Sequence, residues 1–201
     1  IMNPEGVSRL WVRGLMADRQ DALAAIAARL ASDKVTAMTA IDAPGCGGQA
    51  ESFARRYAAT GVRYTLSVLP LSAKAPHDVL LLCPDRQVAR RVLHGLPDGL
   101  RIYGLAGELL SSAEAGRHHL VLASPEALLV SRDKKANLVD VHAAAAARLL
   151  VSALKSAGRN LDRTGLVAAV DAVSDPERQL DYAADTLNGT AFVPFIETKP
   201  R

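Results

Sequence analysis

Short apolar runs alternate along most of this chain with longer segments that have helical periodicity. Several of the runs are apolar at consecutive positions, which is typical of strands buried on both faces. We predict strands over 8–13, 35–42, 62–69, 78–83, 100–105 and 119–123. Between the runs, apolar residues recur at intervals of three and four, which predicts helices over 18–33, 49–60, 86–96 and 107–115.

Residues at the ends of these segments support their boundaries. Asp18 is suited to cap the first helix, because its carboxylate can accept hydrogen bonds from the free amides of the first turn. Gly61 suits the left-handed position after a helix, and Pro84 suits a helix start. Helices between successive strands favour a parallel sheet with right-handed crossovers. The expected fold class is therefore α/β, a doubly wound, mostly parallel Rossmann-like sheet.

Two further helices are expected toward the C-terminus. The first covers 140–157 and ends at Gly158. The second covers 161–173 and is capped by Asp162 or Thr164.

A hairpin is expected beyond the helix pair. The Asn188-Gly189 pair is a strong signal for a type I′ turn, so we predict a hairpin over 180–198 with 191–196 as its return strand. The chain then divides into a Rossmann-like lobe, 5–130, and a helix pair with a terminal hairpin packed on it, 138–201.

The composition narrows the classes of function. Of 201 residues, 49% are apolar and 4% are aromatic, which leaves few aromatic faces to stack sugars or bases. The 24 basic residues are interleaved with 21 acidic ones, so we expect a solvated surface and no nucleic-acid partner. No run approaches about 18 strongly apolar residues, so no membrane-spanning helix is expected. The first six residues lack the pattern of a signal peptide; a removed signal or an upstream portion outside this sequence would both leave such a start.

The two cysteines, Cys46 and Cys83, fall at the ends of two predicted strands. They could form a disulfide between neighbouring strand ends or remain as two free thiols. A free Cys46 near a helix start could act as a thiolate nucleophile, and Cys83 could meet His118 and His119 in a transition-metal site. No recognisable catalytic or metal-binding signature accompanies these residues, so we expect neither enzymatic activity nor a cofactor or metal.

A glycine-rich turn, 45–50, follows the second predicted strand. It matches the dinucleotide-binding fingerprint with alanine in the third place, and its glycines would let a pyrophosphate approach backbone amides. Such a site also needs an acidic residue after the next strand. That strand ends at 67–70 without an acid, and Asp78 comes too late. A dinucleotide-binding enzyme domain is therefore a second alternative behind the two hypotheses given below.

Two stretches resemble a known family. In 9–42, an arginine at the end of a strand leads to Asp18, Gln20 and a helix. In 141–173, an alanine-rich helix ends in Ala157-Gly158-Arg159, and Leu161-Asp162-Arg163 begins the next helix. Both are similar to the type I periplasmic binding proteins of the branched-chain amino acid and amide ABC transporter family. The match is to the second lobe and the C-terminal part, because the family's first lobe, which would precede Asn3, is not in this sequence.

The resemblance implies binding of a small polar solute such as an amino acid or amide. It also implies hinge closure over that solute, a periplasmic location and delivery to a membrane transporter. Its site is expected at the carboxyl ends of the strands, with Asp18, Gly45, Cys46, Cys83 and Glu126 as the candidate contacts. The alternative is a non-catalytic interaction subunit that binds a protein partner on the same scaffold.

Overall fold

The fold is known from a computed structural model that describes residues 17–68, 77–109, 116–125, 138–159, 161–175, 180–181, 193–198 and 200. It forms two compact units, which comprise 22–124 with 194–201, and 1–21 with 125–193. The expected division at 5–130 and 138–201 differs from this one at both ends of the chain. There, residues 1–21 group with 125–193, and residues 194–201 group with the sheet.

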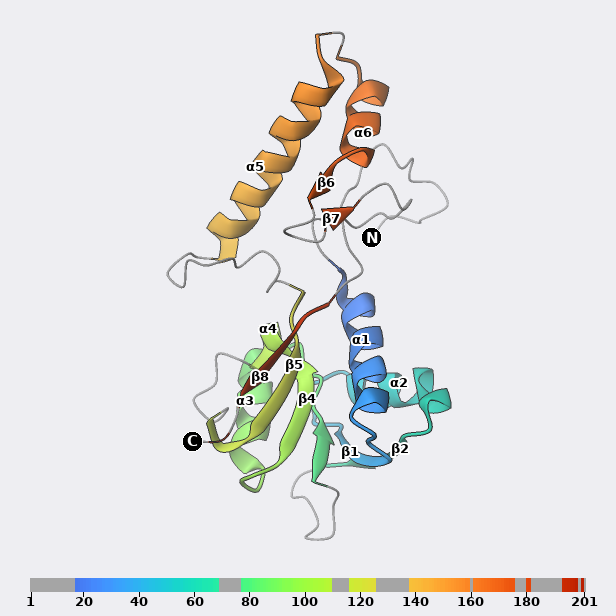
Figure 1. Ribbon diagram of the computed structural model, residues 1–201. Coiled ribbons are helices and arrows are strands. Elements are labelled where there is room, and N and C mark those ends of the chain that lie inside the picture. Colours follow the sequence, from blue (N-terminus) through green and yellow to red (C-terminus); the bar gives the residue numbers. More distant parts are fainter. Residues whose placement is uncertain are drawn as a thin grey trace. The chain divides into compact units, whose positions relative to one another are not determined.

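A six-stranded sheet forms the centre of the unit 22–124 with 194–201 (Figure 1). Its order is β2-β1-β3-β4-β5-β8. The strands are β1 (Ala37–Ile41), β2 (Arg63–Ser67), β3 (Asp78–Leu80), β4 (Arg101–Leu105), β5 (His119–Ala123) and β8 (Phe195–Thr198). The first five strands of the sheet order pair in parallel and β8 is antiparallel to β5. The prediction of a mostly parallel α/β fold is therefore confirmed, while the predicted strand 8–13 lies outside the described residues.

Helices occupy the connections between these strands. They are α1 (Arg19–Ser32), α2 (Gln49–Arg56) with a 3₁₀ turn η1 (Ala58–Thr60), α3 (Arg86–Gly95) and the short α4 (Ala106–Leu109). Gly61 has a φ of 81°, which confirms its left-handed position after η1. Among the described residues, no helix has the length and apolarity needed to cross a lipid bilayer.

One face of the sheet packs against α3 and α4. Alternate strand residues meet the buried side of α3 in one apolar cluster, and Ile196 of β8 packs against the same cluster. Its members include Val79, Ile102, Leu120 and Leu122 from the strands, and Val88, Val92, Leu93 and Leu109 from the helices. Each fully buried side chain of this kind stabilises the fold by roughly 1.5–3 kcal/mol.

The opposite face is covered by α1, as Figure 1 shows. The helical spacing places Ala22, Leu23, Ile26, Ala27 and Leu30 on its buried side. Tyr103 of β4 is fully buried, and its hydroxyl donates a hydrogen bond to Asp33 just beyond α1 at 2.8 Å. Burial, together with this bond, raises the pKa of the Tyr103 phenol.

The same helix holds β8 in place. Arg29 of α1 donates a hydrogen bond to Glu197 at 2.6 Å and lies 5.5 Å from the centre of the Phe195 ring. Arg29 also donates to Asp33 at 2.8 Å. These contacts fix the last strand to a helix far from it in sequence.

The hairpin prediction for 180–198 is wrong in its pairing. Leu180–Asp181 (β7) pairs antiparallel with Ser174–Asp175 (β6), and β8 pairs with β5 instead. The predicted Asn188-Gly189 turn lies outside the described residues. A strong local turn signal does not decide which strand a segment pairs with. Here β5 is the last parallel strand of the apolar sheet, and β8 pairs with its open edge.

The other unit contains the predicted helix pair. It comprises α5 (Leu138–Ala157), which Gly158 ends with a φ of 73°, and α6 (Arg163–Asp171), and the two helices pack against each other. Asp162 caps α6, because its carboxylate accepts the Gly165 amide at 2.6 Å. This confirms Asp162 as one of the two caps considered.

Gly104 allows β4 to approach the segment after β3. A Cβ atom at this position would lie 2.6 Å from the Leu81 carbonyl oxygen and 2.7 Å from Leu109 Cδ1. The leucine could turn away, but the carbonyl is backbone and cannot move without shifting the sheet.

We therefore expect Gly104→Ala to lower the free energy of unfolding by about 1–3 kcal/mol. Gly116→Ala is the matched control, because a Cβ atom there meets nothing within 4 Å, and its effect should stay within about 0.5 kcal/mol. Urea unfolding measures both. Equal stability of the two variants would contradict the close approach.

His118 is buried at the start of β5. Its side chain is 0% exposed, and neither ring nitrogen makes a hydrogen bond of normal geometry to a described residue. Burial lowers the pKa of His118, and neighbouring Arg117 lowers it further, against smaller opposing effects of the Leu93 backbone and Asp98.

The unfolded chain therefore binds a proton at His118 more readily than the folded one. The stability contributed by neutral His118 should be complete above the ordinary pKa of about 6.5 and should fall as the pH drops below it. His118→Phe should flatten the pH dependence of thermal unfolding between pH 8 and pH 5, compared with the wild type in the same buffers. An unaltered slope in His118→Phe would contradict this assignment.

Candidate functional site

The carboxyl edge of the parallel sheet is the candidate site, because open α/β sheets bind ligands where their strands end. The turns after β1, β3 and β4 meet at this edge, since these strands are parallel neighbours in the sheet. They carry the candidate side chains: Asp42 and Cys46 follow β1, Cys83 and Asp85 follow β3, and Glu108 lies in α4 after β4.

The turn from Ala43 to Gly48 joins β1 to α2. Gly45, Gly47 and Gly48 all have left-handed backbone, with φ values of 94°, 67° and 64°. The turn closes with a hydrogen bond from the Cys46 amide to the Ala43 carbonyl at 3.0 Å, and Gly45 and Gly47 are exposed. The glycines thus allow a tight turn that leaves backbone open to a ligand.

The start of α2 has no side chain at its N-cap position. Gly48 precedes the helix and, as a glycine, cannot cap its first turn through a side chain. The free amides of a helix start and the positive end of its dipole favour a carboxylate or phosphate. Asp85, by contrast, caps α3 by accepting the Gln87 and Val88 amides at 2.8 and 3.1 Å. The two helix starts therefore differ, because α3 has an N-cap side chain and α2 does not.

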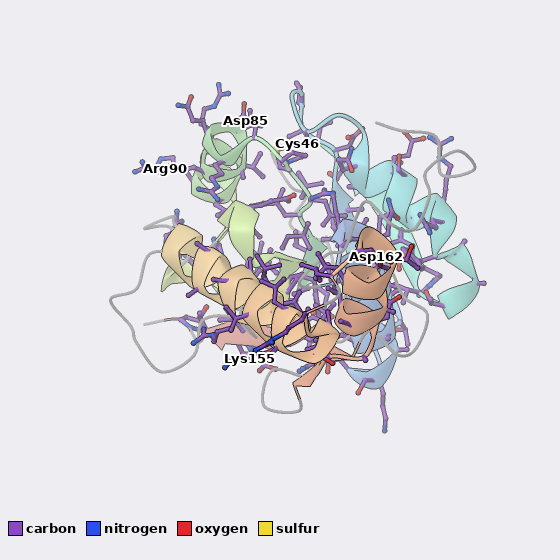
Figure 2. All side chains as sticks on the ribbon, turned by 90° about the horizontal axis from the view of Figure 1, so that it is seen from above. Cys46, Asp85, Arg90, Lys155 and Asp162 are labelled. Carbon is purple, nitrogen blue, oxygen red and sulfur yellow. A yellow bond between two sulfur atoms is a disulfide. The ribbon has the colours of Figure 1, made fainter. Side chains whose placement is uncertain are left out.

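A disulfide between Cys46 and Cys83 links the two turns. The Cα atoms of the pair are 4.5 Å apart, and both residues are buried. Figure 2, a view from above, shows Cys46 close to Asp85 at the start of α3. The sequence left open whether the thiols were bonded, and the structure shows that they are.

A buried carboxylate supports the second turn. Glu108 is 8% exposed, and its Oε2 accepts a hydrogen bond from the Cys83 amide at 2.7 Å. The Cys83 amide, in the segment after β3, is therefore bound by a carboxylate in the segment after β4. Disulfide and carboxylate together hold Cys83 from both neighbouring strands.

Among the acidic side chains that the structure describes at this edge, Asp42 makes no side-chain hydrogen bond that would occupy it. Its backbone amide donates to the Ser67 carbonyl at 3.0 Å, but its carboxylate makes no hydrogen bond to a described residue. It is half-buried and directly precedes the glycine turn. A half-buried carboxylate without a described partner, in the turn that leads to the positive end of a helix, offers one of the two charges that a small zwitterion needs.

The predicted site residues fall into three groups. Gly45, Cys46 and Cys83 come together at the carboxyl edge. Asp18 caps α1, because its Oδ1 accepts the Gln20 and Asp21 amides at 2.7 and 2.9 Å, so its role as a contact stays a prediction. Glu126 lies outside the described residues.

Sequence reasoning missed Asp42, Asp85 and Glu108. A signal for Asp42 was present, since it is an acid directly between a buried run and a glycine-rich turn. Asp85 follows Pro84 at a helix start, which is a typical cap position. Glu108 gave no signal, because a carboxylate in a short helix is normally exposed.

The alternative chemistries lose support at this edge. Both sulfur atoms are in the disulfide, so neither supplies a thiolate for catalysis or for a metal. His118 lies at the start of β5, the opposite edge from Cys83, and the described residues hold no cluster of potential metal ligands. β2 ends at Ser67 without an acid to hold a ribose, which disfavours the dinucleotide.

The disulfide should contribute measurably to stability. It closes a loop of 37 residues, so removing it should lower the free energy of unfolding by about 4 kcal/mol on the chain-entropy relation. Cys46→Ala/Cys83→Ala, compared with the wild type in urea unfolding, measures this.

Reductant is the matched control. It should destabilise the wild type toward the double variant and leave the double variant unchanged. A wild type that shows two reactive thiols before reduction, or a double variant of equal stability, would contradict the cross-link.

Comparison with known proteins places this geometry in a fold. No protein-family model matches the chain, and no curated protein does. Solved structures do match: a substrate-binding periplasmic protein from Ralstonia solanacearum aligns with a TM-score of 0.57 at 16% identity. The alignment covers 95% of this chain and 67% of the Ralstonia protein.

Two further structures agree with the first. Rp1789 from Rhodopseudomonas palustris aligns with a TM-score of 0.59 at 12% identity, with 99% of this chain covering 71% of that protein. An extracellular ligand-binding receptor from Verminephrobacter eiseniae aligns with a TM-score of 0.54 at 12% identity, with coverages of 90% and 64%. The chain thus has the fold of periplasmic and extracellular ligand-binding proteins and spans about two thirds of their length.

Proposed function

We propose that this chain binds a small polar solute, such as an amino acid or an amide, at the carboxyl edge of its sheet. The observation that carries the proposal is the Asp42 carboxylate, which makes no hydrogen bond to a described residue and directly precedes the glycine turn that leads into α2. The similarity to ligand-binding proteins over nearly the whole chain supports the same class of function.

In this proposal each end of the solute has its own partner. The Asp42 carboxylate accepts hydrogen bonds from an ammonium or amide group, and the backbone amides at the start of α2 donate to a carboxylate or carbonyl. Gly45 and Gly47 let the solute approach the backbone, since they carry no side chains over the turn. Asp18 and Glu126 are retained as further contacts on the family resemblance.

The disulfide supports a function outside the reducing cytosol. Structural disulfides persist in oxidising compartments such as the periplasm. We propose a periplasmic protein that presents its solute to a membrane transporter, as the resemblance implies. The few aromatic residues, 4% of the chain, favour recognition by charge and hydrogen bonds over stacking.

A thermal-shift screen of the oxidised protein against amino acids, their amides and small organic acids tests this function. We expect one class of solute to raise the melting temperature in proportion to its concentration, because a ligand that binds the folded state stabilises it. Failure of all three classes to shift the melting temperature would contradict the proposal.

Calorimetry on the best solute then tests the site. Asp42→Asn should weaken binding at least about tenfold, which corresponds to 1.4 kcal/mol. Asp98→Asn is the matched control, because Asp98 precedes β4 at the opposite, amino edge of the sheet and should leave affinity unchanged. Unchanged affinity in Asp42→Asn would show that the solute does not bind at Asp42 and would contradict the proposed site.

A further inference from the structure

One half of the disulfide belongs to the turn at which we propose that the solute binds. Cys46 is buried, yet Gly45 and Gly47 on either side of it are exposed. None of residues 43–48, all of which the structure describes, belongs to a strand or a helix. The turn can therefore open locally and expose the Cys46 sulfur without breaking the pairing of the sheet.

The two halves of the disulfide are held unequally. The Cys83 amide donates to the buried carboxylate of Glu108 at 2.7 Å, and Asp85, two residues later, caps α3. Cys46, by contrast, lies between glycines with left-handed backbone. When the bond between the sulfur atoms breaks, Cys83 keeps its position, and the turn that carries Cys46 gains conformational freedom.

The Cys83 sulfur has a neighbour that suits a thiol. It lies 3.6 Å from the backbone oxygen of Asp85. A sulfur atom in a disulfide has no proton to donate to this oxygen, whereas a thiol has a weakly donating S–H group. The reduced form of Cys83 therefore has a hydrogen-bond acceptor already in place.

We propose that the Cys46–Cys83 disulfide is a reversible redox switch of the solute site, which a dithiol opens. The oxidised cross-link holds the glycine turn in the shape that binds the solute. After reduction the turn samples other shapes, and the affinity falls because the shape that binds is only a fraction of the population. The inference rests on the proposed function, since it concerns regulation of the same site.

The switch is a two-electron thiol–disulfide exchange. One thiolate of the dithiol attacks the Cys46 sulfur, the bond between the two protein sulfurs breaks, and Cys83 leaves as a thiolate that takes up a proton. The second thiolate of the dithiol attacks the first within the mixed disulfide, and Cys46 leaves and is protonated in turn. Two electrons and two protons thus pass from the dithiol to the protein, and the dithiol becomes a disulfide.

Strand pairing makes the switch reversible. β1 and β3 are parallel neighbours, paired at Thr39 with Val79 and at Ala40 with Leu80, and this pairing does not depend on the cross-link. The two thiols therefore stay close to each other in the reduced protein, so oxidation restores the same bond. The chain has two cysteines, so a dithiol has no other disulfide to reduce within it.

Hydrogen exchange of the solute-free protein, oxidised and reduced with dithiothreitol, tests the release of the turn. The Cys46 amide, which donates to the Ala43 carbonyl in the oxidised turn, should exchange at least about tenfold faster after reduction. The Gly99 amide, which donates to the Arg117 carbonyl at the amino edge of the sheet, is the matched control and should keep its rate. Equal exchange of the Cys46 amide in both forms would overturn the switch.

Calorimetry with the solute that stabilises the oxidised protein most tests the control of binding. Reduction should weaken the affinity at least about tenfold, and re-oxidation should restore it. Cys46→Ala/Cys83→Ala should bind as weakly as the reduced wild type, both with and without dithiothreitol. An effect of dithiothreitol on this variant, or an unchanged affinity of the reduced wild type, would overturn the proposal.

Circular dichroism of the reduced wild type accompanies both measurements. A native spectrum is expected, because the sheet and its apolar cluster remain without the cross-link. An unfolded reduced protein would overturn the switch, since the cross-link would then hold the whole fold and not the turn alone.

A monothiol tests the direction of attack. With glutathione in place of the dithiol, the mixed disulfide should accumulate on Cys46, as mass spectrometry of peptides measures. Its accumulation on Cys83 would contradict the unequal hold on the two sulfur atoms.

These outcomes separate the switch from the proposed function. If the oxidised protein binds a solute and reduction leaves the affinity unchanged, the proposed function stands and the switch is wrong. If no solute binds the oxidised protein, the proposed function is wrong, and the switch of solute binding is overturned with it.

Discussion

The covalent link between Cys46 and Cys83 is the constraint on which the carboxyl edge of this sheet depends. β1 and β3 are parallel neighbours, and the cross-link joins the turns that follow them. A turn with three left-handed glycines would otherwise have considerable conformational freedom. Holding Cys46 fixes the middle of that turn, so the exposed backbone on either side of it keeps one shape. A preorganised backbone binds a solute without an ordering cost.

The rest of the edge is built around the same point. Glu108 holds the Cys83 amide from α4, and α4 can reach it because Gly104 lets the segments after β3 and β4 approach closely. Asp85 then caps α3 and satisfies its first amides, whereas α2 has no such cap. These two acids thereby form hydrogen bonds within the structure, whereas Asp42 makes no side-chain hydrogen bond to a described residue. Packing, cross-link and charge thus all shape the edge at which we propose that a polar solute binds.

Much of this fold could be predicted from local pattern. Runs such as 119–123 are apolar on both faces, and the caps Asp18 and Asp162 act through neighbouring amides, so sequence alone locates them. What could not be predicted depends on contacts distant in sequence. The pairing of β8 with β5 and the cross-link both depend on which strands are neighbours. The site was predicted in part: the glycine turn was recognised, but the burial of Glu108 that supports it leaves no local trace.

The proposed function places a small polar solute at the turn between β1 and α2. Hydrogen exchange of the oxidised protein, with and without the solute that stabilises it most, tests this directly. We expect slower exchange of the amides of Gly45 to Ala50, with the amides of Asp98 and Gly99, at the opposite, amino edge of the same sheet, unaffected. Binding that protects other amides and leaves this turn unchanged would contradict it.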